Sequence, residues 1–252
     1  MSSTVNLEWK FSPDDYFEEA ISISAINYSM TIENGQIEAV IDASVFDADP
    51  GLRERLHQEL EGRFLAVQLL THKPYELSRS SLSRVHADGR RDVFVEVETA
   101  NFNISGGVID LQVVDSDGTV KVDTKRDRIQ EKRRLGEVVP GHLYHDTLLI
   151  SMLRSYQAAV RDPDDELVHL YEIRDALADN FGSHKVVKTA LGISDTSWSR
   201  FERLCNEGSL RQGRHRGKGS GQLRNASSAE LEEAREIARS MISGYLRYLE
   251  ND

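Results

Sequence analysis

The sequence has a single cysteine, Cys205, among 252 residues, so the chain cannot close an internal disulfide bond. A lone thiol is typical of proteins that fold in a reducing compartment. Residues 1–10 also lack a basic segment followed by an apolar run, which a secretory signal requires. We therefore expect a cytoplasmic location.

Long hydrophobic runs are missing as well. No apolar stretch approaches the roughly 20 residues that a helix needs to cross a bilayer, so we expect no membrane partner. The dinucleotide-binding fingerprint, the serine-hydrolase elbow, the zinc-protease motif and the kinase motifs are all absent. His142 and His145 lie close to Asp146, but two histidines without a cysteine or a fourth ligand are weak evidence for zinc. We predict that the protein uses no cofactor and no metal.

Positive charge is scarce, because 31 Lys and Arg residues face 42 Asp and Glu residues and the net charge is −11. Such a protein repels nucleic acid over most of its surface. The segment 209–225 reverses this balance with five basic residues and no acid. Arginine forks match phosphate oxygens, and glycines let backbone N–H groups approach an anion. The alternative is a solvated loop whose charges pair with acidic side chains. The predicted phosphate or nucleic-acid contacts are Arg214, Arg216, Lys218 and Arg224, with Asn206 as a polar neighbour.

His215 is the one imidazole in this basic segment, and it lies between Arg214 and Arg216. Neighbouring positive charge favours a neutral imidazole, which can act as a general base toward a ribose hydroxyl. Arginines nearby can stabilise the charge that develops on the phosphate. The pattern predicts His215 as the general base of a metal-independent endoribonuclease, with the arginines holding the phosphate. The alternative is a histidine that only decorates an exposed loop.

The first half of the chain has a hydrophobic period of two, which is typical of half-buried strands. Asn34-Gly35 separates two such segments and predicts a tight hairpin. Leu52, Leu56 and Leu60 share one face of a short helix. Residues 1–139 are therefore predicted to form a β-rich domain, a curved antiparallel sheet with one or two helices. Further strands are predicted at 63–71, 75–85, 91–99, 106–114 and 119–123.

The pattern changes after residue 124. Residues 125–135 are predicted to be a charged helix or linker, and Pro140-Gly141 predicts a break before the next regular element. Apolar residues then recur at helical spacing, and Ser227 with Glu230 has the capping-box pattern that begins a final helix. Residues 140–252 are predicted to form a helical bundle, so the fold class of the whole chain is α+β.

The segment Tyr171-Glu172-Ile173-Arg174-Asp175, the Arg-His segment and the final helix together resemble HEPN domains, in particular the bacterial Apea-like group. The resemblance implies a homodimeric helical bundle, a role in anti-phage defence or toxin systems, and binding of RNA or a nucleotide, often with metal-independent RNA cleavage. The catalytic signature of the family is an Arg and a His with a spacer slightly longer than the three residues between Arg211 and His215. The resemblance implies that Arg211 is catalytic together with His215, and that Glu172 or Asp175 orients an arginine across the bundle.

Two other functions remain open at this point. Residues 185–204 have a glycine between two short helical segments and an inward-facing Trp198, which is typical of a DNA-binding helix-turn-helix that would use Arg200. A non-catalytic interaction module is the third possibility, with Tyr245 and Tyr248 of the final helix forming a dimer face. The partner of the β-rich half is unknown.

Overall fold

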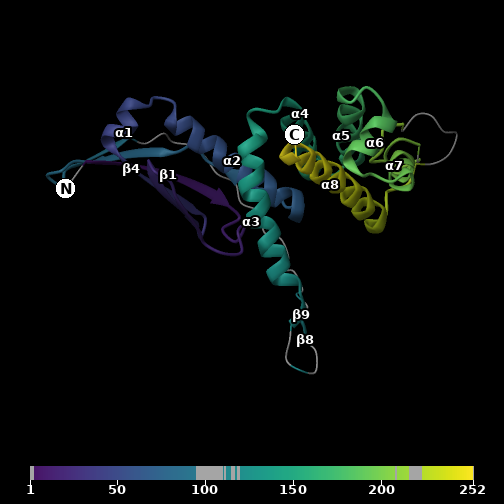
Figure 1. Ribbon diagram of the computed structural model, residues 1–252, viewed down its shortest axis with the longest axis horizontal. Helices are drawn as coiled ribbons and strands as arrows, with labels where there is room; N and C mark the ends of the chain where they lie inside the picture. Colours follow the sequence, from purple (N-terminus) through teal and green to yellow (C-terminus); the bar gives the residue numbers. More distant parts are fainter. Residues whose placement is uncertain are drawn as a thin grey trace. The chain divides into compact units, whose positions relative to one another are not determined.

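The structure is a computed structural model, and it divides the chain into two units. The first consists of Met1–Val67 and Tyr75–Gly136, and the second of Gln68–Pro74 and Glu137–Asp252. Figure 1 labels their helices and some of their strands. The described residues are 3–94, 110, 112–114, 117, 120–207, 209–215 and 223–251.

One antiparallel sheet organises the first unit. Its strand order is β2-β3-β4-β1-β6-β7, and β5 pairs with β1. A separate antiparallel pair is formed by β8 (Gln112–Val114) and β9 (Val120–Asp123). Together with the helices of the second unit, this sheet confirms the predicted α+β fold class. The strands of the sheet are β1 (Thr4–Ser12), β2 (Ile21–Ser24), β3 (Tyr28–Glu33), β4 (Gln36–Asp42), β5 (Glu76–Leu77), β6 (Ser81–Val85) and β7 (Arg91–Phe94).

The predicted hairpin at Asn34-Gly35 is confirmed. Both residues have positive φ, 48° and 76°, and the register places Glu33 opposite Gln36. An Asn-Gly pair tolerates this backbone, so the turn joins β3 to β4 without strain. For the predicted strands at 91–99 and 106–114, β7, residue 110 and β8 are described, and the other residues of these ranges lie outside the described part of the chain.

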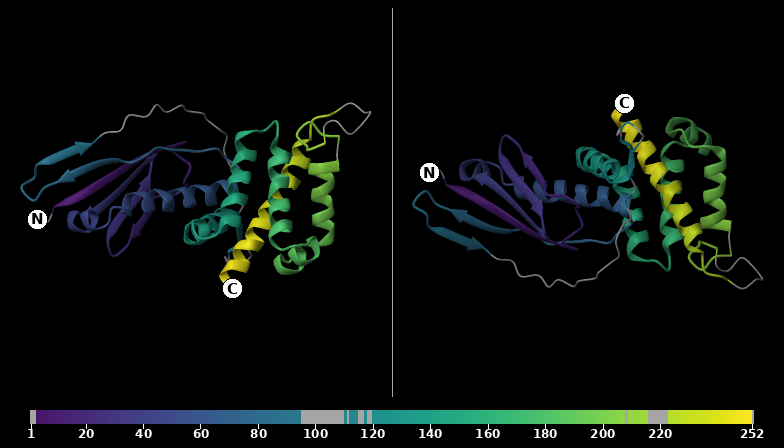
Figure 2. Two further views of the ribbon diagram at one scale, coloured as in Figure 1. Left: turned by 90° about the horizontal axis from the view of Figure 1, so that it is seen from above. Right: turned by 90° about the horizontal axis from the view of Figure 1, so that it is seen from below.

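The predicted strand at 63–71 is wrong, because these residues continue a helix. The short helix α1 (Ala43–Ala48) is followed by α2, which runs unbroken from Leu52 to Thr71. The residues from Phe64 to Leu69 are all buried. Their sequence therefore lacks the regular spacing of polar residues by which a helix can be told from a strand. Within the first unit α2 lies along the sheet (Figure 2), and Tyr16 donates a hydrogen bond to the carbonyl of Phe64 at 3.0 Å.

The predicted break at Pro140-Gly141 is also wrong, because α3 spans Thr124–Leu143 and includes Pro140. A proline ring inside a helix crowds the carbonyl four residues earlier. That residue is Gly136, whose backbone adjusts more easily than that of any other residue. The first half of α3 is fixed by charge, since Arg128 donates to Glu18 from Nε and Nη2, both at 2.8 Å.

Helices form the described part of the second unit. The capping box predicted for the last helix is confirmed: the Ser227 N–H donates to Glu230 at 2.9 Å, and the Glu230 N–H donates to Ser227 Oγ at 3.3 Å. Figure 2 shows α8 lying across α4 and α5, which it contacts. No helix in the described residues is both long and apolar enough to span a bilayer. The elements are α4 (Thr147–Arg161), α5 (Glu166–Asn180), α6 (His184–Leu191), α7 (Asp195–Glu202), a π-helix, η1 (Arg203–Glu207), and α8 (Ser228–Asn251).

A buried polar network ties this unit together. Glu166 is 1% exposed and accepts hydrogen bonds from Arg235 Nε at 2.6 Å and Nη2 at 2.9 Å. His72 Nε2 lies 3.5 Å from Glu166 Oε1, and His72 Nδ1 lies 3.3 Å from the Tyr156 hydroxyl. Helices α4, α5 and α8 and the segment 68–74 thus meet at one charged cluster.

The network makes the stability of this unit depend on pH. Burial, followed by the charge of Arg235, lowers the pKa of His72 from 6.5 to about 4. Below pH 6.5 His72 is therefore protonated in the unfolded chain and stays neutral in the folded chain. The free energy of unfolding falls as the pH falls toward 4. Over that window the loss should be about 3 kcal/mol, at roughly 1.4 kcal/mol per pH unit.

The His72→Asn variant should lose much of this slope, because asparagine does not titrate. Asparagine also tolerates the positive φ of 52° at this position. Urea denaturation at stepped pH values measures the free energy of unfolding of both proteins. Identical slopes would show that His72 takes up no proton when the protein unfolds.

Candidate anion-binding site

The base of the basic segment is fixed by backbone hydrogen bonds. The Arg211 N–H donates to the carbonyl of Arg224 at 2.9 Å, which brings the two ends of the segment together. The Gly213 N–H donates to the carbonyl of Leu210 at 3.1 Å and closes a turn. The Arg214 N–H donates to the carbonyl of Cys205 at 3.0 Å. The segment therefore sits against η1 at the position from which Arg214 projects.

Arg214 lies between an aromatic ring and a carboxylate. Its guanidinium carbon lies 4.7 Å from the ring centroid of Tyr171, and Nη1 donates to Asp175 Oδ2 at 2.7 Å. Tyr171 and Asp175 are one turn apart on α5, so a single helix face supplies both contacts. Among the described residues, Nη1 makes the one side-chain hydrogen bond of Arg214. Within the described residues its remaining N–H groups have no side-chain partner, so in that part of the chain they can meet an anion.

A second guanidinium lies beneath the first. Arg174 is 2% exposed, its Nη1 donates to the Tyr171 hydroxyl at 2.5 Å, and its Nη2 donates to Glu202 at 2.9 Å. It also lies over the rings of Tyr171 at 5.0 Å and Trp198 at 4.7 Å. Burial raises the pKa of Tyr171, which keeps its hydroxyl protonated. Nε of Arg174 is buried and has no partner among the described residues.

The π-helix η1 supplies the adjoining wall. π-helical turns are rare in proteins, and those that occur are often found at functional sites. Cys205 is fully buried, and burial raises the pKa of its thiol, which disfavours the thiolate that a nucleophile requires. Asn206 Oδ1 is buried without a partner in the described part of the chain. An amide oxygen accepts and does not donate, so Asn206 can bind a phosphate only through Nδ2.

Not all of the other predicted site residues contact Arg214 or its neighbours. Arg224 is bound by Glu230, with hydrogen bonds of 2.8 and 2.6 Å, and so belongs to the cap of α8. Glu172 accepts a hydrogen bond from Ser155 of α4 at 2.9 Å. Arg211 is exposed and His215 is half-buried. Arg216 and Lys218 lie outside the described residues.

The segment predicted to be a helix-turn-helix has the expected turn. Gly192 ends α6 with φ of 67°, and Ser194 caps α7 by accepting from the Ser197 N–H at 3.1 Å. Arg200, however, is held by Glu233 through hydrogen bonds of 2.8 and 2.7 Å. The side chain that would contact DNA is therefore already paired, which gives the DNA-binding alternative less support.

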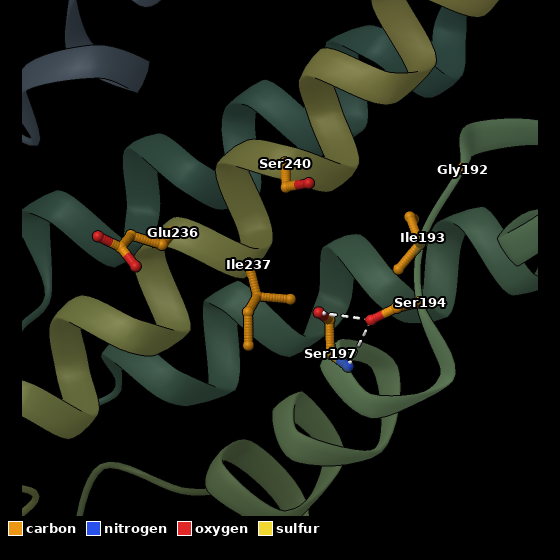
Figure 3. A pocket seen from close by; sticks show the side chains of 7 residues that line it. All are labelled: Gly192, Ile193, Ser194, Ser197, Glu236, Ile237 and Ser240. Atoms are coloured by element: carbon orange, nitrogen blue, oxygen red, sulfur yellow. Dashed lines mark hydrogen bonds between the residues drawn. The ribbon is translucent and has the colours of Figure 1, made fainter.

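A pocket of about 310 Å³ lies between this turn and α8 (Figure 3). Ser194 and Ser197 are hydrogen-bonded to each other at its edge, whereas the carboxylate of Glu236 points away from them in this view. It therefore presents hydroxyl groups without a facing charge. Its lining residues are Gly192, Ile193, Ser194, Ser197, Glu236, Ile237 and Ser240.

The tyrosines predicted to form a dimer face are mostly engaged within the unit. Tyr245 is 4% exposed and donates to Asp146 at 2.8 Å. Tyr248 stacks on Tyr245 with centroids 6.1 Å apart and remains 38% exposed. One partly exposed ring is a small surface for dimerisation.

Comparison with known proteins adds no identity, since no protein-family model, no curated protein and no solved structure matches this chain. Within the described residues, no group of three or more His, Cys, Asp or Glu side chains is arranged to hold a metal ion.

Proposed function

We propose that the second unit is a HEPN-like domain that binds single-stranded RNA or a nucleotide through the phosphate. The observation that supports this proposal is the position of Arg214, which is held by Tyr171 and Asp175 while most of its donors stay available. A guanidinium held in place loses less entropy on binding than a mobile one, and its fork matches phosphate oxygens. Arg211 adds a second exposed cation on the same segment.

The proposal extends to RNA cleavage. His215 would abstract the ribose 2′-hydroxyl proton, and the 2′-oxygen would attack the adjacent phosphorus. The bond to the 5′-oxygen then breaks, that oxygen takes a proton from water, and the products are a 2′,3′-cyclic phosphate and a 5′-hydroxyl end. Arg211 and Arg214 would stabilise the extra negative charge on the phosphate. The HEPN resemblance further suggests a homodimer that acts in bacterial defence or in a toxin system.

Arg214→Ala should weaken binding of single-stranded RNA about tenfold, because a charge-assisted contact contributes roughly 1.5 kcal/mol. Its salt dependence should also become shallower by about 0.7 in the slope of log K against log salt. Fluorescence anisotropy with a labelled RNA over a series of salt concentrations measures both quantities. The RNA affinity of Arg214→Lys should lie between those of the unchanged protein and Arg214→Ala, because lysine keeps the charge but lacks the forked guanidinium.

Arg154→Ala is the matched control, since Arg154 is an exposed arginine of α4 in the same unit. It removes the same net charge and should leave RNA affinity nearly unchanged. Equal weakening by both variants would mean that only the overall charge matters. Tighter binding of duplex DNA than of RNA, with dependence on Arg200, would favour the helix-turn-helix function instead.

A further inference from the structure

Asp175 lies between the two guanidiniums of the candidate site. Its Oδ2 accepts from Arg214 Nη1 at 2.7 Å, and its Oδ1 lies 3.7 Å from Arg174 Nη1. The side chain of Asp175 is 47% exposed and that of Arg214 is 39% exposed, whereas that of Arg174 is 2% exposed. One carboxylate therefore faces an accessible cation and a buried one.

The carboxylate engages Nη1 of Arg214, one of the N–H groups that a phosphate can also bind. A carboxylate and a phosphate oxygen both bind a guanidinium through the same N–H groups. From this geometry we propose that Asp175 is an intramolecular competitor that weakens phosphate binding at Arg214 until an RNA phosphate displaces it. The inference rests on the proposed function, and it assigns Asp175 an inhibitory role instead of an orienting one.

The contacts of Arg214 allow this exchange. Ion pairs between partners this exposed are weak, because water screens them. When the carboxylate leaves, the guanidinium keeps its place over the Tyr171 ring at 4.7 Å. Tyr171 itself is fixed by its hydrogen bond with Arg174. Arg214 is thus positioned for an incoming phosphate without help from Asp175.

The displaced carboxylate also has a partner to move to. Arg174 Nη1 is 3.7 Å from Asp175 Oδ1, slightly beyond a hydrogen bond, so a small rotation completes the contact. Glu202 already accepts from Nη2 of Arg174, and Glu172 accepts from Ser155, so neither binds Arg214 in the structure. Among the described carboxylates, Asp175 is the one that contacts Arg214.

The test measures binding of two probes, a single-stranded RNA and inorganic pyrophosphate, to the full chain. Asp175→Asn keeps the size of the side chain and removes its charge. It should bind both probes about two- to fivefold more tightly than the unchanged protein, which is the range expected for loss of an exposed ion pair. Asp179→Asn is the control, because Asp179 is exposed one turn further along α5 and should change affinity little.

The same substitution in the Arg214→Ala protein shows whether Asp175 acts through Arg214. In Arg214→Ala protein, Asp175→Asn should have no further effect, because the competed cation is gone. Weaker or unchanged binding by Asp175→Asn would overturn the proposal, and so would an equal gain with and without Arg214. If pyrophosphate binding responds as expected and RNA does not bind, the competitor role stands and the RNA function fails. Binding of neither probe to any variant overturns both.

Discussion

Glu166→Ala should lower the free energy of unfolding by about 3 kcal/mol, the low end of the cost of breaking a buried ion pair. Glu166 is 1% exposed and accepts two hydrogen bonds from Arg235, so its removal leaves a partly buried guanidinium without its main partner. Glu232, 3.4 Å from Arg235, keeps the cost from being larger. Urea denaturation followed by circular dichroism measures the change.

The control for this variant is Glu236→Ala, an exposed glutamate of α8, which should change stability by less than about 0.5 kcal/mol. The double variant Glu166→Ala/Arg235→Ala should lose less than the sum of the single losses, because it leaves no charge unpaired. Strict additivity would show that the two side chains are not coupled.

His215→Ala should slow cleavage of single-stranded RNA by at least about a hundredfold, which is the smaller end of the contribution of a general base. RNA binding should remain, because the phosphate contact is assigned to Arg214. Timed gel analysis of a labelled RNA gives the rate, and identification of a 2′,3′-cyclic phosphate end shows that the 2′-hydroxyl was the nucleophile. The two measurements separate loss of chemistry from loss of binding.

His145→Ala is the matched control for this experiment, since His145 is an exposed histidine of the second unit. It should cleave at the rate of the unchanged protein after identical purification. Cleavage by His215→Ala at that same rate would remove His215 from the mechanism and would point to a contaminating nuclease or to another base. Binding without cleavage in all proteins would leave a binding domain with no enzymatic step.

The elements that the sequence predicts well are those with local chemistry. The Asn34-Gly35 turn and the Ser227–Glu230 cap each need only residues a few positions apart, and both form. The end of α2 was predicted wrongly because its burial comes from the rest of the fold, which local periodicity does not contain. Pro140 lies inside α3 for a similar reason, since local propensity is a weak guide where packing continues the helix.

In the candidate site, too, the sequence predicts individual residues but not the contacts between them. Charge alone singled out Arg214, and the resemblance to HEPN domains suggested Asp175, but their contact joins residues 39 positions apart. The sequence pattern assigns no role to Arg174. Its importance comes from burial between the rings of Tyr171 and Trp198, which only the packing of α5 against α7 creates.

The lone cysteine has a practical consequence. Because Cys205 is enclosed and its thiol resists ionisation, maleimide reagents should leave the native protein unlabelled while it stays folded. A new cysteine placed at an exposed position such as Ser209 would then carry a single dye without removal of the natural residue. Such a label sits beside Leu210, at the base of the basic segment, and would report directly on the approach of an anion.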